Sequence, residues 1–373
     1  MSSVPKAAIA ARHLPQLDGL RALAVLAVCW HHWMLRRYHA GINWGSTGVD
    51  LFFVLSGFLI TGILLSCRRP IEAGTQGVGF TARRFYARRF LRIFPLYYAV
   101  LALASAVLTL EPGILVSLWT YSFNLWGAWR GMLSGSFVSH FWSLAVEEQF
   151  YLVWPWVILC APRRALLSVV AATIAVGPLS RAVLFTAGAP FDAMRMVTTS
   201  CLDLLAGGAL GAILAERHGL EQALRGRFAR ALGLAGAALF VWGFAIQMNG
   251  PHANGTSQLE VLVVYSRWPF FTWLVLRSAQ GFRGALALLL ESRPLAFVGK
   301  VSYGVYVFHA FALGLDRLGL AALHPLVRCV VYIAFTLAVS WLSWTLFESR
   351  LNALKDRFPY EERPAAGTRR AAA

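Results

Sequence analysis

The sequence predicts an all-α fold, a polytopic bundle of about ten transmembrane helices. Of its 373 residues, 58% are hydrophobic and only 14% are charged, whereas soluble domains carry about 25% charged residues. Apolar runs long enough to cross a bilayer recur along the whole chain. The net charge of +17 comes mainly from basic residues in the gaps between these runs, a distribution typical of cytoplasmic loops. We therefore expect membrane lipid, and no nucleic acid, as a partner of this charge.

The predicted spans follow the apolar runs in chain order. They are residues 17–35, 47–66, 93–110, 139–160, 165–185, 198–216, 230–248, 259–277, 296–315 and 323–347. The run at 112–127 is shorter and contains Pro112 and Asn124, so it predicts an interfacial or re-entrant segment. With the N-terminus in the cytoplasm, most of the 34 lysines and arginines fall on the cytoplasmic side, which favours ten spans with both termini there.

The same pattern divides the chain into three parts. Residues 1–16 are predicted to be a cytoplasmic N-terminal segment, residues 17–348 the transmembrane domain and residues 349–373 a basic cytoplasmic tail. The tail ends in YEERPAAGTRRAAA, which is polar and rich in alanine and proline, so we expect it to be largely disordered. The five cysteines form no CxxC pair and show no metal-ligand spacing, so we expect neither a disulfide framework nor a metal site.

The first span, LDGLRALAVLAVCWHHW, carries an arginine near one end and a histidine pair at the other. A helix advances about 100° per residue, so Arg21 and His32 differ by about 20° and share a face, whereas His31 points about 80° away. Ionisable residues inside a membrane span are costly, so this pair indicates chemistry. The structural alternatives are an interfacial arginine that contacts lipid phosphate and a histidine that joins helices by hydrogen bonds.

Two later spans supply acidic residues. Asp50 enters the second span in GVDLFFVLSG, and Glu147 and Glu148 lie in the fourth, SHFWSLAVEEQFYLVWPW. We predict that Asp50 and Glu147 belong to the same site as His32. The alternatives are a carboxylate of Asp50 that caps its helix or orients a histidine, and a structural ion pair between Glu147 and an arginine of another helix.

The connection at 68–92 contains the basic, aromatic stretch RRFYARRFLRIFP. Arg84, Arg88 and Arg92 are four residues apart, so they form a stripe along one helix face near the cytoplasmic membrane surface. The structural alternative is a juxtamembrane segment that binds anionic lipid headgroups. The functional prediction is a site for a donor that bears several phosphates.

The ninth span, AFVGKVSYGVYVFHAF, is rich in polar side chains. Ser302, Tyr306 and His309 share a face, Tyr303 neighbours them and Lys300 lies at the inner end. Ser302 and Tyr303 are the candidate substrate-binding residues. The alternative is that these hydroxyl groups only join packed helices by hydrogen bonds.

This set of residue types suits one kind of chemistry. A neutral histidine near an acid can take a proton from a hydroxyl as that hydroxyl attacks a thioester. The resulting oxyanion needs a cation or hydrogen-bond donors nearby. The sequence contains no GxSxG, Walker A, HExxH or paired CxxC motif, so serine hydrolase, NTPase and zinc-enzyme classes have no support. His32 is therefore the candidate general base.

Five blocks of sequence, spread over nearly the whole chain, carry a family resemblance. They are LDGLRALAVLAVCWHH at 17–32, GVDLFFVLSGFLI at 48–60, RRFYARRFLRIFPLYY at 83–98, FWSLAVEEQFYLVWP at 141–155 and VGKVSYGVYVFHAF at 298–311. In this order they resemble the acyltransferase-3 family of membrane acyltransferases. The resemblance covers the membrane domain and includes no SGNH-hydrolase-like domain of the kind that some relatives append.

The resemblance implies an acyl-CoA donor, commonly acetyl-CoA, that is a co-substrate presented from the cytoplasm rather than a permanently bound cofactor. It implies an acceptor hydroxyl on a glycan, a lipid-linked sugar or a secondary metabolite, and a location in the bacterial inner membrane. The family roles fall on Arg21 and His32 as its Arg/His motif, on Asp50 and Glu147 as its membrane acids, and on Arg88 and Arg92 as its donor-side basic motif.

These residues predict one polar channel through the bundle. A pantetheine arm is about 15–20 Å long when extended, so the nucleotide can stay at the cytoplasmic end while the thioester reaches His32. The predicted channel is lined by Arg21, His32, Asp50, Glu147, Ser302 and Tyr303. The competing functional class is a proton-coupled secondary transporter, because helices with buried acids, histidine and arginine also suit such a carrier. Consumption of labelled acetyl-CoA by the purified protein would distinguish the two.

Overall fold

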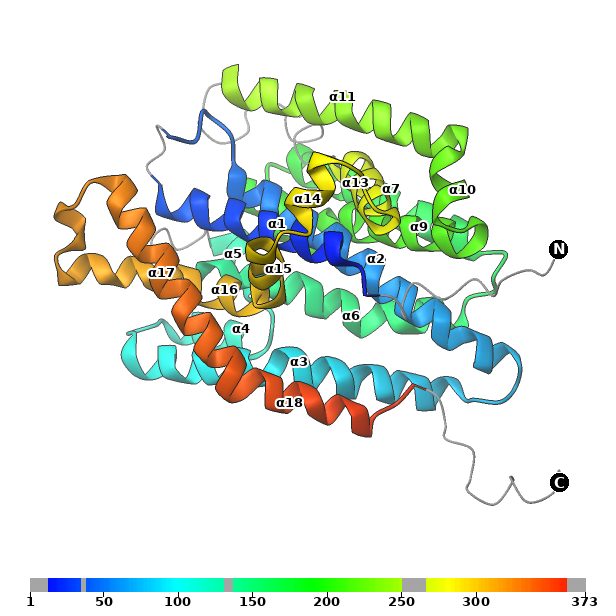
Figure 1. The fold of residues 1–373 in the computed structure, drawn as a ribbon, viewed down its shortest axis with the longest axis horizontal. Coiled ribbons are helices and arrows are strands. Elements are labelled where there is room, and N and C mark those ends of the chain that lie inside the picture. The colour runs from blue at the N-terminus through cyan, green and yellow to red at the C-terminus, as the bar shows by residue number, and fades with distance from the viewer. Residues whose placement is uncertain (1–12, 35–37, 131–136, 250–265, 361–373) are drawn as a thin grey trace.

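The computed structural model describes residues 13–34, 38–130, 137–249 and 266–360, and every regular element in these ranges is a helix (Figure 1). The helices of the first half are α1 (Pro15–Trp33), α2 (Trp44–Glu72), α3 (Val78–Val107), α4 (Pro112–Trp119), α5 (Phe123–Arg130), η3 (Ser139–Phe141), α6 (Trp142–Cys160) and α7 (Leu166–Thr186). Those of the second half are α8 (Phe191–Met196), η4 (Thr198–Cys201), α9 (Leu202–His218), α10 (Leu220–Arg225), α11 (Arg227–Asn249), α13 (Trp268–Gln280), α14 (Ala285–Leu290), α15 (Arg293–Lys300), α16 (Ser302–Phe308), η5 (His309–Leu318), η6 (Leu320–Ala322), α17 (Pro325–Ser343), η7 (Trp344–Glu348), α18 (Ser349–Ala353) and η8 (Leu354–Arg357). The all-α fold class is confirmed.

Six of the described helical segments are long and apolar enough to cross a membrane. They comprise α2, α3, α7, α9 with η4, α11, and α17 with its continuation to Arg357. A seventh forms if the pair Arg293–Lys300 and Ser302–Leu318, bent by 65°, counts as one span. The remaining predicted spans coincide with α1 and α6, which carry the ionisable residues, and with α13, whose predicted span begins outside the described residues. The count of ten stays a prediction.

The run at 112–127 forms two short helices rather than one long one. Helices α4 and α5 have eight residues each, so each is about 12 Å long, less than half the thickness of the hydrocarbon core. This geometry agrees with the prediction that the segment is interfacial or re-entrant.

Two predicted boundaries shift in the structure. Helix α3 begins at Val78 rather than near residue 93, so the basic stretch and the apolar span form one continuous helix. The predicted tail beginning at residue 349 starts instead with α18 and η8, which pack against α3 (Figure 1). Residues 349–360 therefore belong to the bundle, because Arg84 and Arg88 of α3 hydrogen-bond their backbone carbonyl oxygens and lie over the rings of Phe358 and Tyr360. Residues 361–373 lie outside the described residues.

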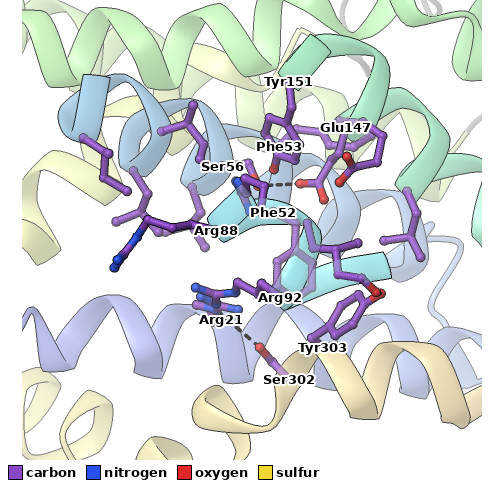
Figure 2. A pocket seen from close by; sticks show the side chains of 18 of the residues that line it. Arg21, Phe52, Phe53, Ser56, Arg88, Arg92, Glu147, Tyr151, Ser302 and Tyr303 are labelled. Carbon is purple, nitrogen blue, oxygen red and sulfur yellow. Dashed lines mark hydrogen bonds between the residues drawn. The ribbon is translucent and has the colours of Figure 1, made fainter. Parts of the chain in front are cut away.

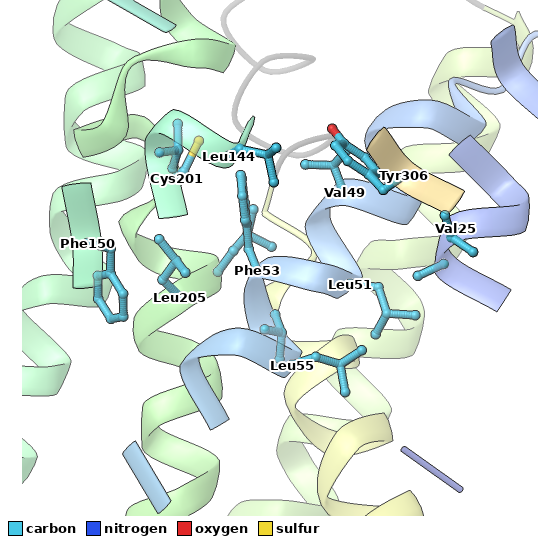
Figure 3. Packing of buried hydrophobic residues seen from close by; sticks show 14 of the residues in the cluster. Val25, Val49, Leu51, Phe53, Leu55, Leu144, Phe150, Cys201, Leu205 and Tyr306 are labelled. Carbon is cyan, nitrogen blue, oxygen red and sulfur yellow. The ribbon is translucent and has the colours of Figure 1, made fainter. Parts of the chain in front are cut away.

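Helix α2 is the centre of the packed core. Buried side chains of α1, α6, α9 and α16 gather around it (Figure 3). Its backbone approaches that of α9 closely, because a Cβ atom added at Gly57 would lie 1.8 Å from the carbonyl oxygen of Leu205, and one at Gly208 would lie 2.0 Å from that of Val54. Small residues at such crossings let membrane helices pack backbone to backbone.

The outer surface is apolar where a lipid-facing surface is expected. Leu103 of α3, Leu234 of α11 and Val330 of α17 are 66%, 75% and 64% exposed. In a soluble protein such a surface would promote aggregation, whereas in a bilayer it lies against lipid chains.

Ion pairs join three connections at one end of the bundle. Nε of Arg163, in the α6–α7 connection, lies 2.9 Å from Oε2 of Glu72 at the end of α2, and its Nη1 lies 3.6 Å from Oε1 of Glu216 near the end of α9. The hydrogen bonds from Arg163 to Glu72 raise the pKa of this arginine. All three connections carry cationic residues that are predicted to be cytoplasmic. That prediction requires the three connections to lie at the same end of the bundle, where the ion pairs place them.

Candidate active site

A cavity of about 410 Å³ lies among α1, α2, α3, α6, α16 and the residues that follow α18 (Figure 2). It runs along α2 from Ser66 to Val49, which are 17 residues apart and so about 25 Å apart along the helix axis. It is therefore a long, narrow channel. Val49, Ser143 and Tyr306 line one end of the channel, whereas Lys355 and Tyr360 line the other end, which is formed by the residues that follow α18.

The channel wall is strongly basic. It contains five cationic side chains, those of Arg21, Arg88, Arg89, Arg92 and Lys355, against the two glutamates Glu147 and Glu148. Figure 2 shows Arg21 and Arg92 close together, with Arg88 farther along the wall and Glu147 across from them. Cations taken out of water are expensive unless anions or water compensate them. An excess of positive charge in an interior channel thus predicts an anionic ligand.

Three of the predicted residues form one part of this wall. Nε of Arg21 donates a hydrogen bond to Oγ of Ser302 over 3.2 Å, which ties α1 to α16. The hydroxyl of the neighbouring Tyr303 donates to the carbonyl oxygen of Ile93 over 2.8 Å, which ties α16 to α3. Arg21, Ser302 and Tyr303 therefore line the channel, and their positions depend on one another.

Glu147 also lies in the channel. Its Oε1 accepts a hydrogen bond from the hydroxyl of Ser56 on α2. Glu148, one residue further along α6, lines the same channel. The channel wall therefore includes both adjacent glutamates of α6.

The basic stripe of α3 is divided by the structure. Arg88 and Arg92 line the channel, and Nη1 of Arg88 donates to the carbonyl oxygen of Lys355 over 2.8 Å. Arg84 lies outside it, and its Nη1 donates to the carbonyl oxygen of Arg357 over 3.2 Å. Arg89, which the prediction omitted, lines the channel and places its guanidinium 4.0 Å from the ring centroid of Tyr151.

The signal for Arg89 is present in the sequence. Arg88, Arg89 and Arg92 occupy positions i, i+1 and i+4 and can face a common cavity on a helix, whereas the prediction followed the i, i+4 row back to Arg84.

Tyr360, at the channel wall, is uncharged at neutral pH, because burial raises its pKa to about 12. It adds no negative charge that would repel an anionic ligand.

His32 lies beyond the channel and does not line it. Its Nδ1 is 2.9 Å from the carbonyl oxygen of Val28 and 3.2 Å from Nε2 of His309. A carbonyl oxygen only accepts hydrogen bonds, so Nδ1 of His32 carries a hydrogen. By the same reasoning Nδ1 of His309, 2.6 Å from the carbonyl oxygen of Tyr306, carries one and leaves its Nε2 as the acceptor. A neutral His32 therefore keeps the lone pair on its Nε2.

His32 belongs to a file of five imidazoles, out of nine histidines in the chain. Successive ring centroids from His39 through His31, His32 and His309 to His140 are 4.8, 5.5, 4.9 and 4.6 Å apart. Both ring nitrogens of the buried His140 lack a hydrogen-bond partner in the part of the chain that the structure describes. The sequence pattern placed His309 on a face of its helix but did not predict this file.

The end of the file formed by His309 and His140 contacts a residue of the channel wall. The hydroxyl of Tyr306, which lines the channel, donates to the carbonyl oxygen of His140 over 2.8 Å and hydrogen-bonds the hydroxyl of Ser143. The ring of Tyr306 lies 5.6 Å from that of His309 between centroids. His32 is thus two ring contacts away from the channel end, through His309 and Tyr306.

Asp50 lies in a separate buried network. Its Oδ2 is 2.8 Å from Nη1 of Arg267, and both side chains are buried. Nearby, Nη2 of Arg181 lies 2.7 Å from Oδ2 of Asp203, and these two residues are almost completely buried. Asp50 is therefore an ion-pair partner that joins α2 to the start of α13, and the structure does not bring it into the channel. Among the described residues no cluster of metal-ligating side chains is present.

Comparisons with known proteins agree with this architecture. A family model described as an acyltransferase domain matches residues 14–345. Peptidoglycan O-acetyltransferase OatA of Listeria monocytogenes is 27% identical over 368 residues, which cover 91% of this chain and 56% of that protein. Putative peptidoglycan O-acetyltransferase YrhL of Bacillus subtilis is 29% identical over 325 residues, covering 80% and 48%.

O-acetyltransferase OatA of Staphylococcus aureus is 29% identical over 330 residues, which cover 80% of this chain and 50% of that protein. The chain spans about half the length of the curated relatives it matches. No solved structure matches it. Because the family match extends over nearly all the described helices, from α1 into η7, the chain belongs to the acyltransferase-3 family.

Proposed function

We propose that this protein is an integral membrane O-acyltransferase that moves an acyl group from acyl-CoA to a hydroxyl of a glycan or related acceptor, with acetyl-CoA as the proposed donor. The observation that carries the proposal is the basic channel, which suits a polyphosphate-bearing donor with a long flexible arm. Its relatives are named for O-acetylation, and two of them for peptidoglycan, which supports a carbohydrate acceptor.

The shape of the channel supports a donor that enters from one end. Arginine forks bind phosphate oxygens well, and Arg88 and Arg92 lie near the end that carries Lys355. A pantetheine arm of about 15–20 Å is shorter than the channel, which is about 25 Å long. With the phosphates at the arginines, the thioester would lie toward Ser143 and Tyr306.

His32 is the proposed general base. Its Nε2 lone pair would take the proton of the acceptor hydroxyl while the hydroxyl oxygen bonds to the thioester carbonyl carbon. The tetrahedral intermediate then breaks the carbon–sulfur bond, and the thiolate of CoA takes up one proton, so the reaction releases none. His309 faces Nδ1 of His32 and connects it to Tyr306 at the channel end, so Nε2 of His32 points away from this contact. The acceptor hydroxyl would therefore bind on the Nε2 side of His32, away from Lys355, and the thioester would have to pass His309 to meet it.

The proposed location is the bacterial inner membrane with both termini in the cytoplasm, so the basic end of the channel would open toward cytoplasmic acyl-CoA. The acceptor would be a glycan, a lipid-linked sugar or a secondary metabolite that reaches the far end. This orientation rests on the distribution of basic residues over the loops.

The test is acyl transfer by the purified protein in lipid nanodiscs with labelled acetyl-CoA. We expect the double variant Arg88→Glu, Arg92→Glu to raise KM for acetyl-CoA at least about tenfold, because each hydrogen bond to a charged group is worth about 1.5–3 kcal/mol. Arg84→Glu is the matched control, since Arg84 is on the same helix but outside the channel. Unchanged KM in a correctly inserted double variant would contradict the proposed donor site.

A further inference from the structure

A second cavity, of about 610 Å³, adjoins the channel. The two share Arg21, Arg92, Tyr303 and Lys355 as a common wall. The rest of the second cavity is formed by the start of α1, by α15 and by the turns around η7 and α18. All of these residues lie toward one end of their helices, so this cavity is a vestibule rather than a passage through the bundle.

The vestibule is shaped by a local widening of the last helix. Residues Trp344–Glu348 form a π-helix, and both Trp344 and Glu348 line the vestibule. Such bulges are frequent at functional sites, because they displace side chains from the regular helical ladder. The ammonium group of Lys300, at the end of α15, lies 5.3 Å from the ring centroid of Trp344.

The vestibule is lined by more cationic than anionic side chains. Neither Arg92 nor Lys300 forms an ion pair with a described residue. Two carboxylates also line the vestibule: Oδ2 of Asp18 lies 3.0 Å from Nε2 of His13, and Oε1 of Glu348 accepts a hydrogen bond from the hydroxyl of Ser343 over 2.8 Å. The vestibule wall therefore carries four cationic side chains, those of Arg21, Arg92, Lys300 and Lys355, against two carboxylates, so it keeps an excess of positive charge.

The two cavities differ in a way that matches the two ends of coenzyme A. The channel is about 25 Å long and holds about 410 Å³, so it suits an extended arm. The vestibule carries the aromatic side chains of Phe297 and Trp344 beside Lys300. An adenine ring with a phosphate on its ribose combines an aromatic surface with a dianion, which these groups complement.

We propose that the vestibule binds the 3′-phosphorylated adenosine end of the donor, with Lys300 paired to the 3′-phosphate and the pyrophosphate at the shared wall of Arg21, Arg92 and Lys355. This inference rests on the proposed function and names a subsite for it. It places the nucleotide between α1, α15 and η7, away from Arg84. The same phosphate chemistry is offered by phospholipid headgroups, so the test separates the two sources.

The experiment compares binding of CoA and of dephospho-CoA, which lacks only the 3′-phosphate, to the full chain in nanodiscs. We expect the wild type to bind CoA about tenfold more tightly, the effect of one charge-assisted contact. Lys300→Gln should weaken CoA binding and leave dephospho-CoA binding unchanged, so that the ratio falls toward one. Lys300→Arg should keep the ratio, and so should Arg293→Gln, a control on the same helix that lies outside the vestibule.

Several outcomes would overturn the subsite. A Lys300→Gln variant that weakens both ligands equally, or neither, would show that Lys300 does not contact the 3′-phosphate. An effect of Lys300→Gln that occurs only in nanodiscs with anionic lipid, and not in purely zwitterionic ones, would assign the vestibule to lipid phosphate. Failure of the wild type to bind either CoA or dephospho-CoA would instead refute the proposed function itself.

Discussion

At the scale of single residues, His32 is distinguished by the hydrogen bonds on its Nδ1. The carbonyl oxygen of Val28 and Nε2 of His309 both face this nitrogen, so the proton is held there and Nε2 remains basic. His31, its neighbour, packs instead against Gly45 and stacks on His39. The two adjacent histidines therefore have different surroundings, as the helical periodicity predicts.

This difference gives a test of the general base. We expect His32→Ala to abolish acyl transfer with normal amounts of protein in the membrane, because no other described imidazole presents a lone pair in the same place. His31→Ala should retain most of the activity. The measurement is initial rate with labelled acetyl-CoA at saturating donor. Equal loss in both variants, or full turnover by His32→Gln, would contradict the assignment of His32.

At the scale of elements, the site depends on how closely α2 and α9 pack. Gly208 allows contact with the backbone of α2, since an added Cβ would lie 2.0 Å from the carbonyl oxygen of Val54. At Gly211, one turn later, the nearest atoms would be 3.4 Å away and belong to side chains. We therefore expect Gly211 to accept a methyl side chain and Gly208 not to accept one, although the sequence does not distinguish the two positions.

We predict that Gly208→Ala destabilises the protein by about 1–3 kcal/mol, the usual cost of overpacking, because backbone on both sides must move. Gly211→Ala should change stability little, since it only reaches ordinary contact distance. Thermal unfolding of both variants in the same detergent measures the difference. If the two variants unfold at the same temperature as each other, the α2–α9 contact is looser than described.

At the scale of the whole molecule, the ion pairs among Glu72, Arg163 and Glu216 place three connections at one end. The positive-inside distribution predicts that this end faces the cytoplasm. The channel end at Lys355 and the vestibule would face the same compartment if α2, α3 and α17 all cross the membrane. Orientation thus links the loop charges to the donor site.

The orientation is tested by single cysteines in a variant whose five native cysteines have been replaced. Ala73→Cys and Arg164→Cys should be protected from a membrane-impermeant maleimide in intact cells, whereas Ala187→Cys, in the α7–α8 connection, should react. All three positions are exposed, so accessibility reports the side of the membrane. Reaction at Ala73→Cys equal to that at Ala187→Cys would contradict the predicted topology.

The sequence alone was sufficient for the helical class, for most span positions and for several of the residues that line the channel, among them Arg21, Arg92 and Glu147. Hydropathy and helical periodicity are local properties, so α2, α7 and α9 appear where apolar runs predict them. Arg21 and Glu147 could be selected because a charge inside a span needs a partner wherever it lies. The sequence blocks that carry the family resemblance contain these same residues and indicate the acyltransferase class.

Only the tertiary structure decided which polar residues meet. Periodicity relates residues on one helix, but the rotation of each helix against its neighbours is set by packing, such as the close approach of α2 and α9. That rotation brings Arg89 into the channel and leaves Arg84 outside. It pairs Asp50 with Arg267, 217 residues away, and inserts His309 and Tyr306 between His32 and the channel, because contacts between distant segments leave no local pattern in the sequence.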